Sequence, residues 1–479
     1  MEKEQVEKYV NEFDKCAEVA VNAGLYDKAC MYASISAEIQ YQWNQNYTDD
    51  RLEKCITIMA ESKKPLLREY HPQSDVVLFY DGFGLDTRGL ALIYLKALCD
   101  LGYKVIYAVP QRAYAQQPEI HKVTAGKSIT FHYLQNGAGD KLIDEILQTF
   151  AKFRPQRAFF YTAPNDVEAC AAFGAMAGKA LRYQINLTDH AFWLGINAFD
   201  KCVEFREYGA CVSHEYRKIS IDKLCLLHYY PYFDQEIPFG GFPFSDEDKP
   251  VLFSGGSLYK TYDDKGTYYD IVRKILQHNK DVLFVYAGSG DSSGMEKLQT
   301  EFPKRVYLIA ERRDLYAVMQ HATLYLNTYP MLGGLMTQYA AIAGRLPLTL
   351  LNCPDNSLDG LLLHHEKMQL EFTRAEDLVA EADKLLSDDN YRKQRERQLT
   401  DCVMNEDKFR HELGNLLEKG NTDFKFTVHN IDTTDFRRPY IYRFTVDSLA
   451  NAIVNKKTVT IWWKYPQLLI RRIKNKFSK

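Results

Sequence analysis

The chain has 479 residues, of which 46% are hydrophobic, 13% aromatic and 26% charged. This composition is ordinary for a folded globular protein, so it excludes a disordered chain, a collagen-like fibre and a small disulfide-rich scaffold. One hydrophobic core stops growing near roughly 250–300 residues, so we expect at least two domains. The formal net charge of −3 excludes nucleic-acid binding through the charge of the whole molecule.

Cysteine usage and the N-terminal sequence both indicate a cytoplasmic protein. The ten cysteines form no CxxC pair and show no zinc spacing, and most lie in apolar runs, so we expect reduced thiols in the core. The N-terminal stretch is charged and lacks the apolar segment of a signal peptide. No run approaches the ~18 apolar residues of a membrane span.

Residues 1–72 are predicted to form a helical region. Val6, Val10 and Phe13 recur at helical spacing. Residues 23–43 alternate small and aromatic side chains, like one helix of a helix-turn-helix repeat. Only one or two such units would fit, so we favour a helical collar packed on the next domain over a small protein-recognition module.

A first α/β domain is predicted for residues 73–245. Apolar strand patterns alternate with amphipathic helical patterns, which is typical of a parallel sheet built from βαβ units. The expected strands are residues 75–80, 104–110, 157–163, 180–188, 210–214 and 223–230, and the expected helices are residues 89–103 and 166–179. Residues 238–250 are rich in proline, glycine and acidic residues, which is typical of a linker between domains.

The same pattern then restarts and predicts a second α/β domain over residues 246–420, followed by a C-terminal segment, 421–479. The expected strands are residues 251–256, 281–290, 305–310, 322–328 and 346–352, and the expected helices are residues 267–280 and 335–344. Doubly wound domains of this kind bind ligands in the loops at the carboxyl ends of their strands.

Two loops of the second domain have the chemistry of a diphosphate site. Gly333 and Gly334 precede a predicted helix with Thr337 in its first turn, and glycine amides at a helix N-terminus attract anions. In the other loop, a lysine follows a glycine pair and can supply a point charge to the same diphosphate; these residues are Gly255, Gly256 and Lys260. A plain tight turn and a solvated surface lysine are the alternatives.

Two loops of the first domain carry candidate bases. Asp86 lies in the loop after the first strand, where it is either a base or the cap of a helix that begins near residue 88. His190 follows Asp189 at a strand end, where it is either a base with an orienting carboxylate or a hydrogen-bonded histidine that shapes the site. No cluster of histidines or cysteines has metal-ligand spacing, so we expect no metal site.

The order of these motifs resembles that of GT-B glycosyltransferases, and of O-GlcNAc transferases in particular. Residues 257–260, Ser-Leu-Tyr-Lys, resemble a segment whose lysine contacts the donor diphosphate in that family. Residues 324–350 are similar to the segment that cradles UDP, and residues 180–195 and 81–89 resemble two segments of the other domain. The likeness covers roughly residues 75–365 as order and pattern.

The resemblance implies a GT-B fold, with two tandem Rossmann-like domains between an N-terminal helical region and a basic C-terminal tail. Residues 73–245 would form the acceptor-side domain and residues 246–420 the nucleotide-sugar-binding domain. The implied donor substrate is a UDP-sugar, and no further cofactor is implied.

The sequence departs from the family pattern in several respects. The acidic residue that holds the ribose falls at Tyr339, for which Asp355 or Asp359, one loop later, would substitute. The histidine of the first loop is replaced by Leu85-Asp86, so the base stays open between Asp86 and His190. The paired glutamates of many retaining enzymes are absent, which favours the inverting class.

The C-terminal tail has a distinct composition. From Asn451 to Lys479 there are eight basic residues and no acidic residue, and tryptophans and aliphatic side chains lie between them in residues 458–479. This pattern predicts peripheral contact with the anionic inner face of a membrane, worth about 1 kcal/mol for each basic residue. A structural C-terminal helix is the alternative. We expect no nucleic-acid binding, because no stacking module accompanies the charge.

The sequence therefore predicts an inverting glycosyltransferase that moves a hexosyl or N-acetylhexosaminyl group from a UDP-sugar to a hydroxyl acceptor. The basic tail favours cell-surface glycan or lipid-linked saccharide synthesis, and the resemblance offers a protein acceptor as the alternative. Two rivals remain, a nucleotide-sugar epimerase on the same fold and a catalytically inactive transferase-like subunit that binds a partner.

Overall fold

The computed structural model describes residues 3–64, 69–87, 89–233, 237–245, 249–454, 465–468, 470 and 473. These residues form two compact units. The first unit comprises residues up to Leu227 together with Arg410–Asn430 and the described residues from Arg443 onward, and the second unit comprises His228–Phe409 and Ile431–Tyr442.

The boundary between the units differs from the expected one near residue 245. The chain enters the second unit at His228, because the aromatic side chains of the following segment pack against the core of the second sheet; these are Phe233, Phe239, Phe242 and Phe244. The predicted linker therefore belongs to the second unit. The chain also returns to the first unit at Arg410, within the residues assigned to the second domain from sequence.

A seven-stranded parallel sheet forms the centre of the first unit, in the order β3-β2-β1-β4-β5-β6-β7. The strands are β1 (Gln73–Asp81), β2 (Lys104–Pro110), β3 (Ile129–Leu134), β4 (Pro155–Tyr161), β5 (Leu181–Asn186), β6 (Lys201–Glu204) and β7 (Leu224–Leu226). Leu78 of β1 lies opposite Ile106 on one side and Ala158 on the other. The strand order reverses at β1 and β4, where doubly wound sheets bind ligands.

Helices connect these strands, as the alternating pattern predicted. They are α4 (Ala91–Asp100), α5 (Pro118–Thr124), α6 (Asp140–Phe153), α7 (Val167–Ala175) and α8 (Glu207–Glu215), with the short 3-10 helices η2 (Gln111–Gln116) and η3 (Ile221–Lys223). The strand predicted at residues 210–214 is wrong, because these residues lie inside α8. These five residues, Ala-Cys-Val-Ser-His, are too few to establish a helical or a strand period, so the local pattern could not distinguish the two.

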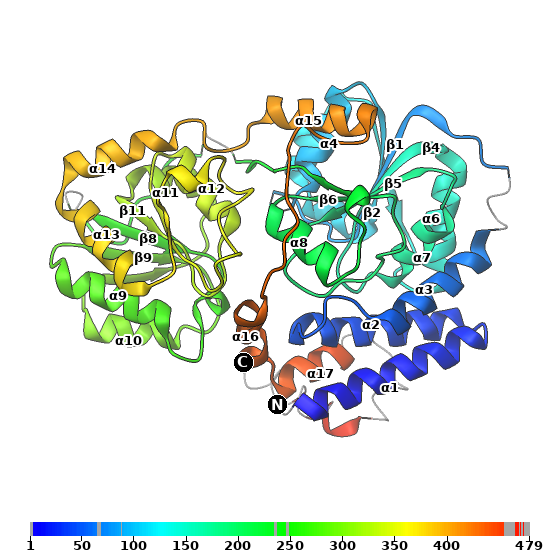
Figure 1. Cartoon of the computed structure of the whole chain (residues 1–479), viewed down its shortest axis with the longest axis horizontal. Helices are drawn as coiled ribbons and strands as arrows, with labels where there is room; N and C mark the ends of the chain where they lie inside the picture. Colours follow the sequence, from blue (N-terminus) through cyan, green and yellow to red (C-terminus); the bar gives the residue numbers. More distant parts are fainter. Residues whose placement is uncertain are drawn as a thin grey trace. The chain divides into compact units, whose positions relative to one another are not determined.

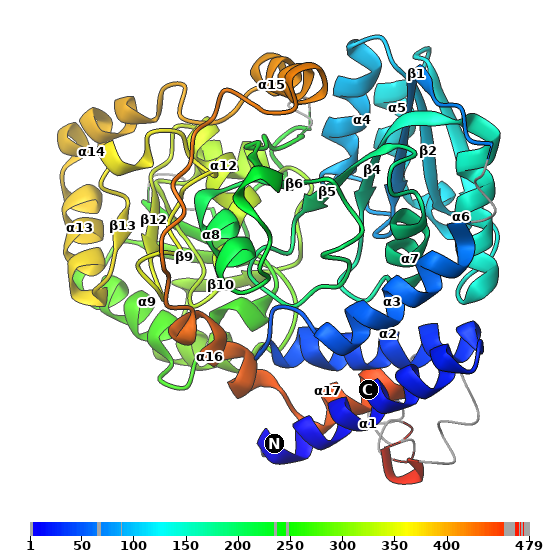
Figure 2. The ribbon, with the colours of Figure 1, turned by 45° about the vertical axis from the view of Figure 1, so that its right-hand side comes forward.

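Three N-terminal helices and one C-terminal helix pack together in the first unit. They are α1 (Lys3–Asn22), α2 (Tyr26–Trp43), α3 (Asp50–Lys63) and α17 (Val446–Val454), and α17 lies beside α1 and α2 (Figure 1, Figure 2). Val6, Val10 and Phe13 are buried in their shared core, as the spacing predicted. Helix α3 also packs on α7, where Gly174 leaves room for the methyl group of Ala60.

The second unit repeats the same architecture. Its six parallel strands follow the order β10-β9-β8-β11-β12-β13 and are β8 (Val251–Gly255), β9 (Leu283–Ala287), β10 (Val306–Ile309), β11 (Leu324–Leu326), β12 (Pro347–Leu350) and β13 (Glu371–Phe372). Its helices are α9 (Thr267–His278), α10 (Ser293–Glu301), α11 (Leu315–His321), α12 (Gly334–Ile342), α13 (Ala375–Ser387), α14 (Asp389–Glu396) and α16 (Thr434–Arg443), and α15 (Glu406–Lys419) leads back to the first unit. The two tandem Rossmann-like sheets predicted from sequence are confirmed.

Two further expectations concern the cysteines and the tail. All ten cysteines are free thiols, and most are buried, as predicted. The predicted membrane-contacting tail, residues 458–479, lies outside the described residues apart from 465–468, 470 and 473. Among the described helices, none has the length and apolarity of a membrane-spanning segment.

Candidate functional site

The glycine turn of the second unit is organised by one buried side chain, Asn327, directly after β11. Its Oδ1 accepts hydrogen bonds from the N–H groups of Thr328 (3.0 Å) and Gly333 (2.9 Å), and its Nδ2 donates to Thr337 Oγ1 (2.9 Å) and Thr349 Oγ1 (3.2 Å). One amide thus joins the end of β11, the turn and the first turn of α12. Asn327 was not among the residues predicted from sequence, although its place between a buried strand and a glycine pair is a signal that could have identified it.

Helix α12 begins at Gly334, where the second glycine of the pair is sterically required. A Cβ atom at this position would lie 2.8 Å from the hydroxyl oxygen of Tyr229. The N-terminus of α12 therefore has backbone N–H groups at a first residue without a side chain of its own, and the Tyr229 hydroxyl lies where a Cβ atom would be. Such N–H groups and the helix dipole favour an anion.

Lys260 lies beside this turn. It belongs to the short 3-10 helix η4 (Leu258–Thr261) after β8, and its Nζ donates to the carbonyl oxygen of Leu332 at 3.5 Å. Met331 N–H donates to the carbonyl oxygen of Lys260 at 3.4 Å. The structure thus brings Lys260 and the Gly333-Gly334 turn together. Their contact with a diphosphate stays a prediction.

Gly255 and Gly256 allow the ends of β8 and β9 to approach closely. A Cβ atom on Gly255 would lie 2.8 Å from the carbonyl oxygen of Ala287, and Gly256 adopts a φ of +129°, which favours glycine. A Cβ atom on Gly288 would lie 1.9 Å from the carbonyl oxygen of Gly256. This glycine pair therefore has a packing role at the carboxyl end of the sheet, immediately before Lys260.

Thr337 and Asp359 occupy different environments near the start of α12. Thr337 is fully buried, and its hydroxyl accepts from Asn327 and donates to the carbonyl oxygen of Gly333 at 3.1 Å. In this structure its hydroxyl supports the turn and has no exposed face. Asp359 is partly exposed in the loop after β12, and nearby Leu361 accepts a hydrogen bond from the Gln338 side chain of α12. Its contact with a ribose stays a prediction.

In the first unit, His190 is oriented by a buried ion pair. Its Nδ1 lies 3.0 Å from Asp189 Oδ1, and the other carboxylate oxygen of Asp189 accepts from Arg206 Nε at 2.5 Å. Burial by itself would raise the pKa of Asp189, but the charges and hydrogen bonds of Arg206 and His190 outweigh it and lower that pKa to about 2. Asp189 is therefore a permanent carboxylate that fixes the imidazole, with Nε2 on the side opposite Asp189. Arg206 was not among the residues predicted from sequence.

Asp86 has a capping role, but for a different helix from the one expected. Its two carboxylate oxygens accept from Glu119 N–H (3.1 Å) and Ile120 N–H (2.9 Å) in the first turn of α5. The expectation that it caps a helix beginning near residue 88 is wrong, because that segment leads into α4 and the partners of Asp86 lie more than thirty residues later. Both of its oxygens are engaged, which makes Asp86 the weaker candidate base.

The loop that contains Asp86 is shaped by Asp81, at the end of β1. Asp81 is buried and accepts hydrogen bonds from the N–H groups of Phe83 and Gly84 (2.9 Å each) and from the Tyr107 hydroxyl (2.7 Å). Burial raises the pKa of Asp81 to about 6, and these hydrogen bonds oppose the rise. Asp81 is the organising carboxylate of this loop.

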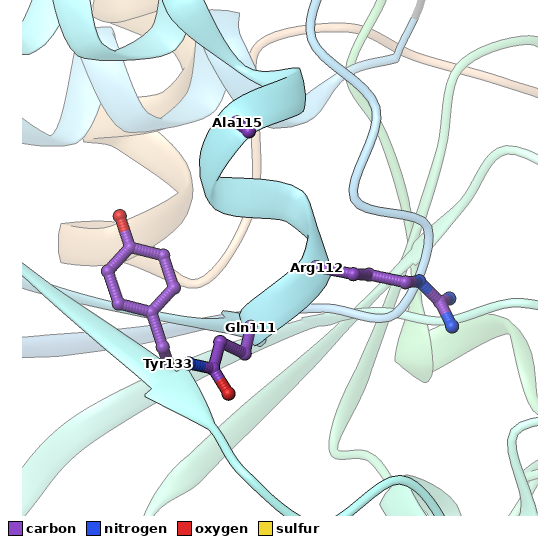
Figure 3. A pocket seen from close by; sticks show the side chains of 4 residues that line it. All are labelled: Gln111, Arg112, Ala115 and Tyr133. Carbon is purple, nitrogen blue, oxygen red and sulfur yellow. The ribbon is translucent and has the colours of Figure 1, made fainter.

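Two further features of the first unit do not form a convincing site. Gln111, Arg112, Ala115 and Tyr133 line a pocket, but the side chains of Arg112 and Tyr133 point away from one another (Figure 3). His411, Glu412 and Asp423 bring three possible metal-ligand atoms within 4.8 Å of one another. Two of these residues already have a polar partner in Asn415. Its side-chain nitrogen lies 3.3 Å from His411 Nε2 and donates to Asp423.

Solved structures share the arrangement of the chain, whereas no family model and no curated protein matches its sequence. A mutant O-GlcNAc transferase from Thermobaculum terrenum has a TM-score of 0.54 and 14% identity, over 92% of this chain and 85% of that one. The chain has a GT-B glycosyltransferase-like fold. The resemblance inferred from the order of the motifs is thereby confirmed at the level of the fold.

Two other structures show how widely this fold is shared. A Listeria monocytogenes protein named for UDP-N-acetylglucosamine 2-epimerase activity has a TM-score of 0.53 and 11% identity, over 74% of this chain and all of that one. The Anabaena protein HepE, solved in complex with UDP and glucose, has a TM-score of 0.50 and 11% identity, over 72% of this chain and 99% of that one. At these identities the likeness concerns the fold.

Proposed function

We propose that this protein is a glycosyltransferase that transfers a sugar from a UDP-sugar to a hydroxyl acceptor. The observation that carries the proposal is the position of the Lys260 ammonium group, 3.5 Å from the carbonyl oxygen that precedes Gly333-Gly334 and the N-terminus of α12. A cation and a set of free helix N–H groups at one place are suited to a diphosphate. The GT-B fold supports this reading, because its solved examples include a protein named as a UDP-N-acetylglucosamine 2-epimerase and one solved in complex with UDP and glucose.

The donor would bind on the second unit. Lys260 and the N–H groups at the start of α12 would stabilise the negative charge that builds on the leaving diphosphate. Asn327 and Thr337 would hold the turn in place, Gly255 and Gly256 would shape the loop before the lysine, and Asp359 would accept from the ribose hydroxyls. In this proposal the protein's own cation and N–H groups neutralise the diphosphate.

His190, on the first unit, is the proposed base. The acceptor oxygen forms a bond to the anomeric carbon, the bond between that carbon and the diphosphate breaks, and the acceptor proton passes to His190 Nε2. The charged Asp189 stabilises the resulting imidazolium. A single displacement of this kind inverts the anomeric centre. Asp86 is the alternative base, and its engagement at α5 argues against it.

The acceptor we propose is a cell-surface glycan or a lipid-linked saccharide. The support is the composition of residues 458–479, which suits peripheral contact with the anionic inner face of a membrane from the cytoplasm. A protein hydroxyl is the second candidate acceptor, supported by the fold shared with an O-GlcNAc transferase. Deleting residues 458–479 should move the protein from the membrane fraction to the soluble fraction, and unchanged partitioning would count against the membrane proposal.

The test of the donor proposal is a screen of UDP-sugars with the full-length protein, in which released UDP and the sugar product are measured separately. A transferase or its slow hydrolytic side reaction releases UDP, whereas an epimerase changes the sugar without releasing UDP. The separate measurement of the sugar product tests the epimerase alternative, because the Listeria protein shares the fold. A catalytically inactive partner subunit would give neither product, and absence of UDP binding in calorimetry would overturn the proposal.

A further inference from the structure

We infer that the N-terminal helical region positions the candidate base, and that Asn44 at the end of α2 is the residue that does so. This inference rests on the proposed function only in naming His190 as the base. The contacts themselves lie within the first unit. They show that the helical region packs on the loop that carries His190.

Asn44 holds the backbone on both sides of Ala191, directly after His190. It is fully buried, its Nδ2 donates to the carbonyl oxygen of His190 at 3.1 Å, and its Oδ1 accepts from the N–H of Phe192 at 3.1 Å. The residue between them, Ala191, is also fully buried. A carboxamide is the side chain that supplies one donor and one acceptor at this spacing. Aspartate or serine at position 44 would lose one of the two contacts or change its polarity.

The backbone conformation of Asn44 also favours this residue type. Its φ is +51° and its ψ is +49°, in the left-handed region, where it ends α2 with its N–H donating to the carbonyl oxygen of Gln40. Asparagine and glycine adopt this conformation at least cost. The helix ending and the contact with the His190 loop are therefore made by one residue.

Neighbouring residues of the same helical region hold the rest of this loop. Glu53 of α3 accepts from the N–H groups of Gly195 (2.6 Å) and Ile196 (3.3 Å), and the carbonyl oxygen of Tyr47 accepts from Trp193 N–H at 3.4 Å. The loop from His190 to Ile196 thus contacts the helical region at three successive places.

The strand side of the same loop is held by Arg217. This arginine is fully buried, and its guanidinium donates to the carbonyl oxygens of Thr188 (3.3 Å), Asp189 (3.0 Å) and Ala191 (2.6 Å). With Arg217 on one side and Asn44 on the other, the main chain of His190 has a fixed orientation. Asp189 then fixes the ring. Removing the Asn44 side-chain amide should make the main chain at His190 more mobile, and with it the imidazole ring.

The experiment compares Asn44→Gly with Ser34→Ala, and measures the rate at which diethylpyrocarbonate modifies each histidine at pH 7. Glycine keeps the left-handed backbone of position 44 but removes both side-chain contacts. The matched control is on the same helix, where Ser34 Oγ donates to the carbonyl oxygen of Asn165, a residue outside the loop from His190 to Ile196. Peptide mass spectrometry measures the modification of His190, whose side chain is 32% exposed. His278, whose side chain is 52% exposed, serves as the internal reference.

We expect the modification rate of His190 relative to His278 to change at least threefold in Asn44→Gly and to stay unchanged in Ser34→Ala. Asn44→Asp, which keeps an acceptor for Phe192 N–H but places an oxygen against the His190 carbonyl, should also change it. An unchanged His190 rate in a folded Asn44→Gly protein, with folding checked by circular dichroism, would overturn the inference.

The same variants separate this inference from the proposed function. If His190 is the base, Asn44→Gly lowers kcat for UDP-sugar turnover and leaves the affinity for UDP unchanged, because the donor site lies on the second unit. If the modification rate changes while His190→Gln retains full turnover, Asn44 still positions the histidine, and the assignment of His190 as base is wrong.

Discussion

The ammonium group of Lys260 lies 3.5 Å from the carbonyl oxygen of Leu332, at the point where the glycine turn leads into α12. The two residues come from the loops after β8 and β11, which are adjacent strands of the second sheet. These strands run parallel, so the loops at their carboxyl ends lie at the same edge of the sheet, at the point where the strand order reverses. The structure thus places a cation and a helix N-terminus together through topology rather than sequence proximity.

Replacing Lys260 by methionine should weaken UDP binding by roughly 10–100-fold, since a hydrogen bond to a charged group contributes about 1.5–3 kcal/mol. Isothermal calorimetry with UDP measures the change. The control is Lys265→Met, an exposed lysine a few residues along the same segment, which should bind UDP like the natural protein. Equal affinities for the two variants would contradict the role given to Lys260.

Gly334→Ala should distort the start of α12, because the added Cβ would lie 2.8 Å from the hydroxyl oxygen of Tyr229. A forced contact of this kind costs about 1–3 kcal/mol. We expect a lower melting temperature and weaker UDP binding, both measured by thermal shift with and without UDP. Adding Tyr229→Phe, which removes the obstructing oxygen, should restore part of both. Failure of the double variant to recover would show that the glycine is needed for another reason.

Thr337→Val should destabilise the protein by about 1–2 kcal/mol, the typical effect of removing a buried hydrogen-bond partner. The hydroxyl that Asn327 contacts would be replaced by a methyl group, so Asn327 Nδ2 would keep only Thr349 of its two partners. Urea unfolding monitored by fluorescence measures the loss. Thr337→Ser, which keeps the hydroxyl, is the matched control and should lose less. A variant that unfolds like the natural protein but no longer binds UDP would instead indicate direct ligand contact.

The two candidate bases can be separated by isosteric changes. Asp86→Asn keeps an oxygen acceptor at the start of α5 and removes the possible base, so turnover should stay within about threefold, because asparagine caps helices about as well as aspartate. His190→Gln should lower kcat by about 10²–10⁴-fold, the usual contribution of a general base. Steady-state rates of UDP release measure both. The reverse pattern would make Asp86 the base.

Glu53 gives the first unit a definite pH dependence. Burial raises the pKa of Glu53 from its usual 4.5 to about 7, although hydrogen bonds from Gly195 and Ile196 N–H groups oppose the rise. The folded state therefore binds this proton more tightly than the unfolded state, so the stability contribution is full below about pH 4.5 and is lost as pH rises through about 7.

Glu53→Gln removes this titration and keeps an oxygen acceptor for both N–H groups. Between pH 5 and pH 8 the natural protein should lose about 2–3 kcal/mol of unfolding free energy relative to the variant, which corresponds to roughly two pKa units. Urea unfolding at the two pH values measures the difference. Burial also raises the pKa of Asp14 to about 7, but Asp14 is present in both proteins and cancels in the comparison. Parallel pH profiles of the two proteins would refute the assignment.

The local sequence pattern predicted a strand or helix well where the residues of that segment alone determine its secondary structure. The strand predicted at residues 104–110 is β2 with the same bounds, and the helix predicted at residues 335–344 is α12 within two residues at its C-terminal end. The pattern was uninformative for residues 210–214, where a short run of mixed residues without a clear period lies inside α8. It also gave no sign of the partner of Asp86, because the N–H groups at the start of α5 lie far along the chain.

The sequence by itself determined the alternation of strands and helices, the glycine turn before α12 and the lysine after β8, because hydrophobic period and glycine are local signals. Only the tertiary structure decided which groups meet. Because β8 and β11 are neighbours, Lys260 lies beside the turn. The buried Thr337 hydroxyl donates to the turn and stabilises it. Asn44, at the end of α2, donates to the His190 carbonyl oxygen. Each of these contacts joins segments that are distant in sequence, and packing of the whole chain sets the distance between them.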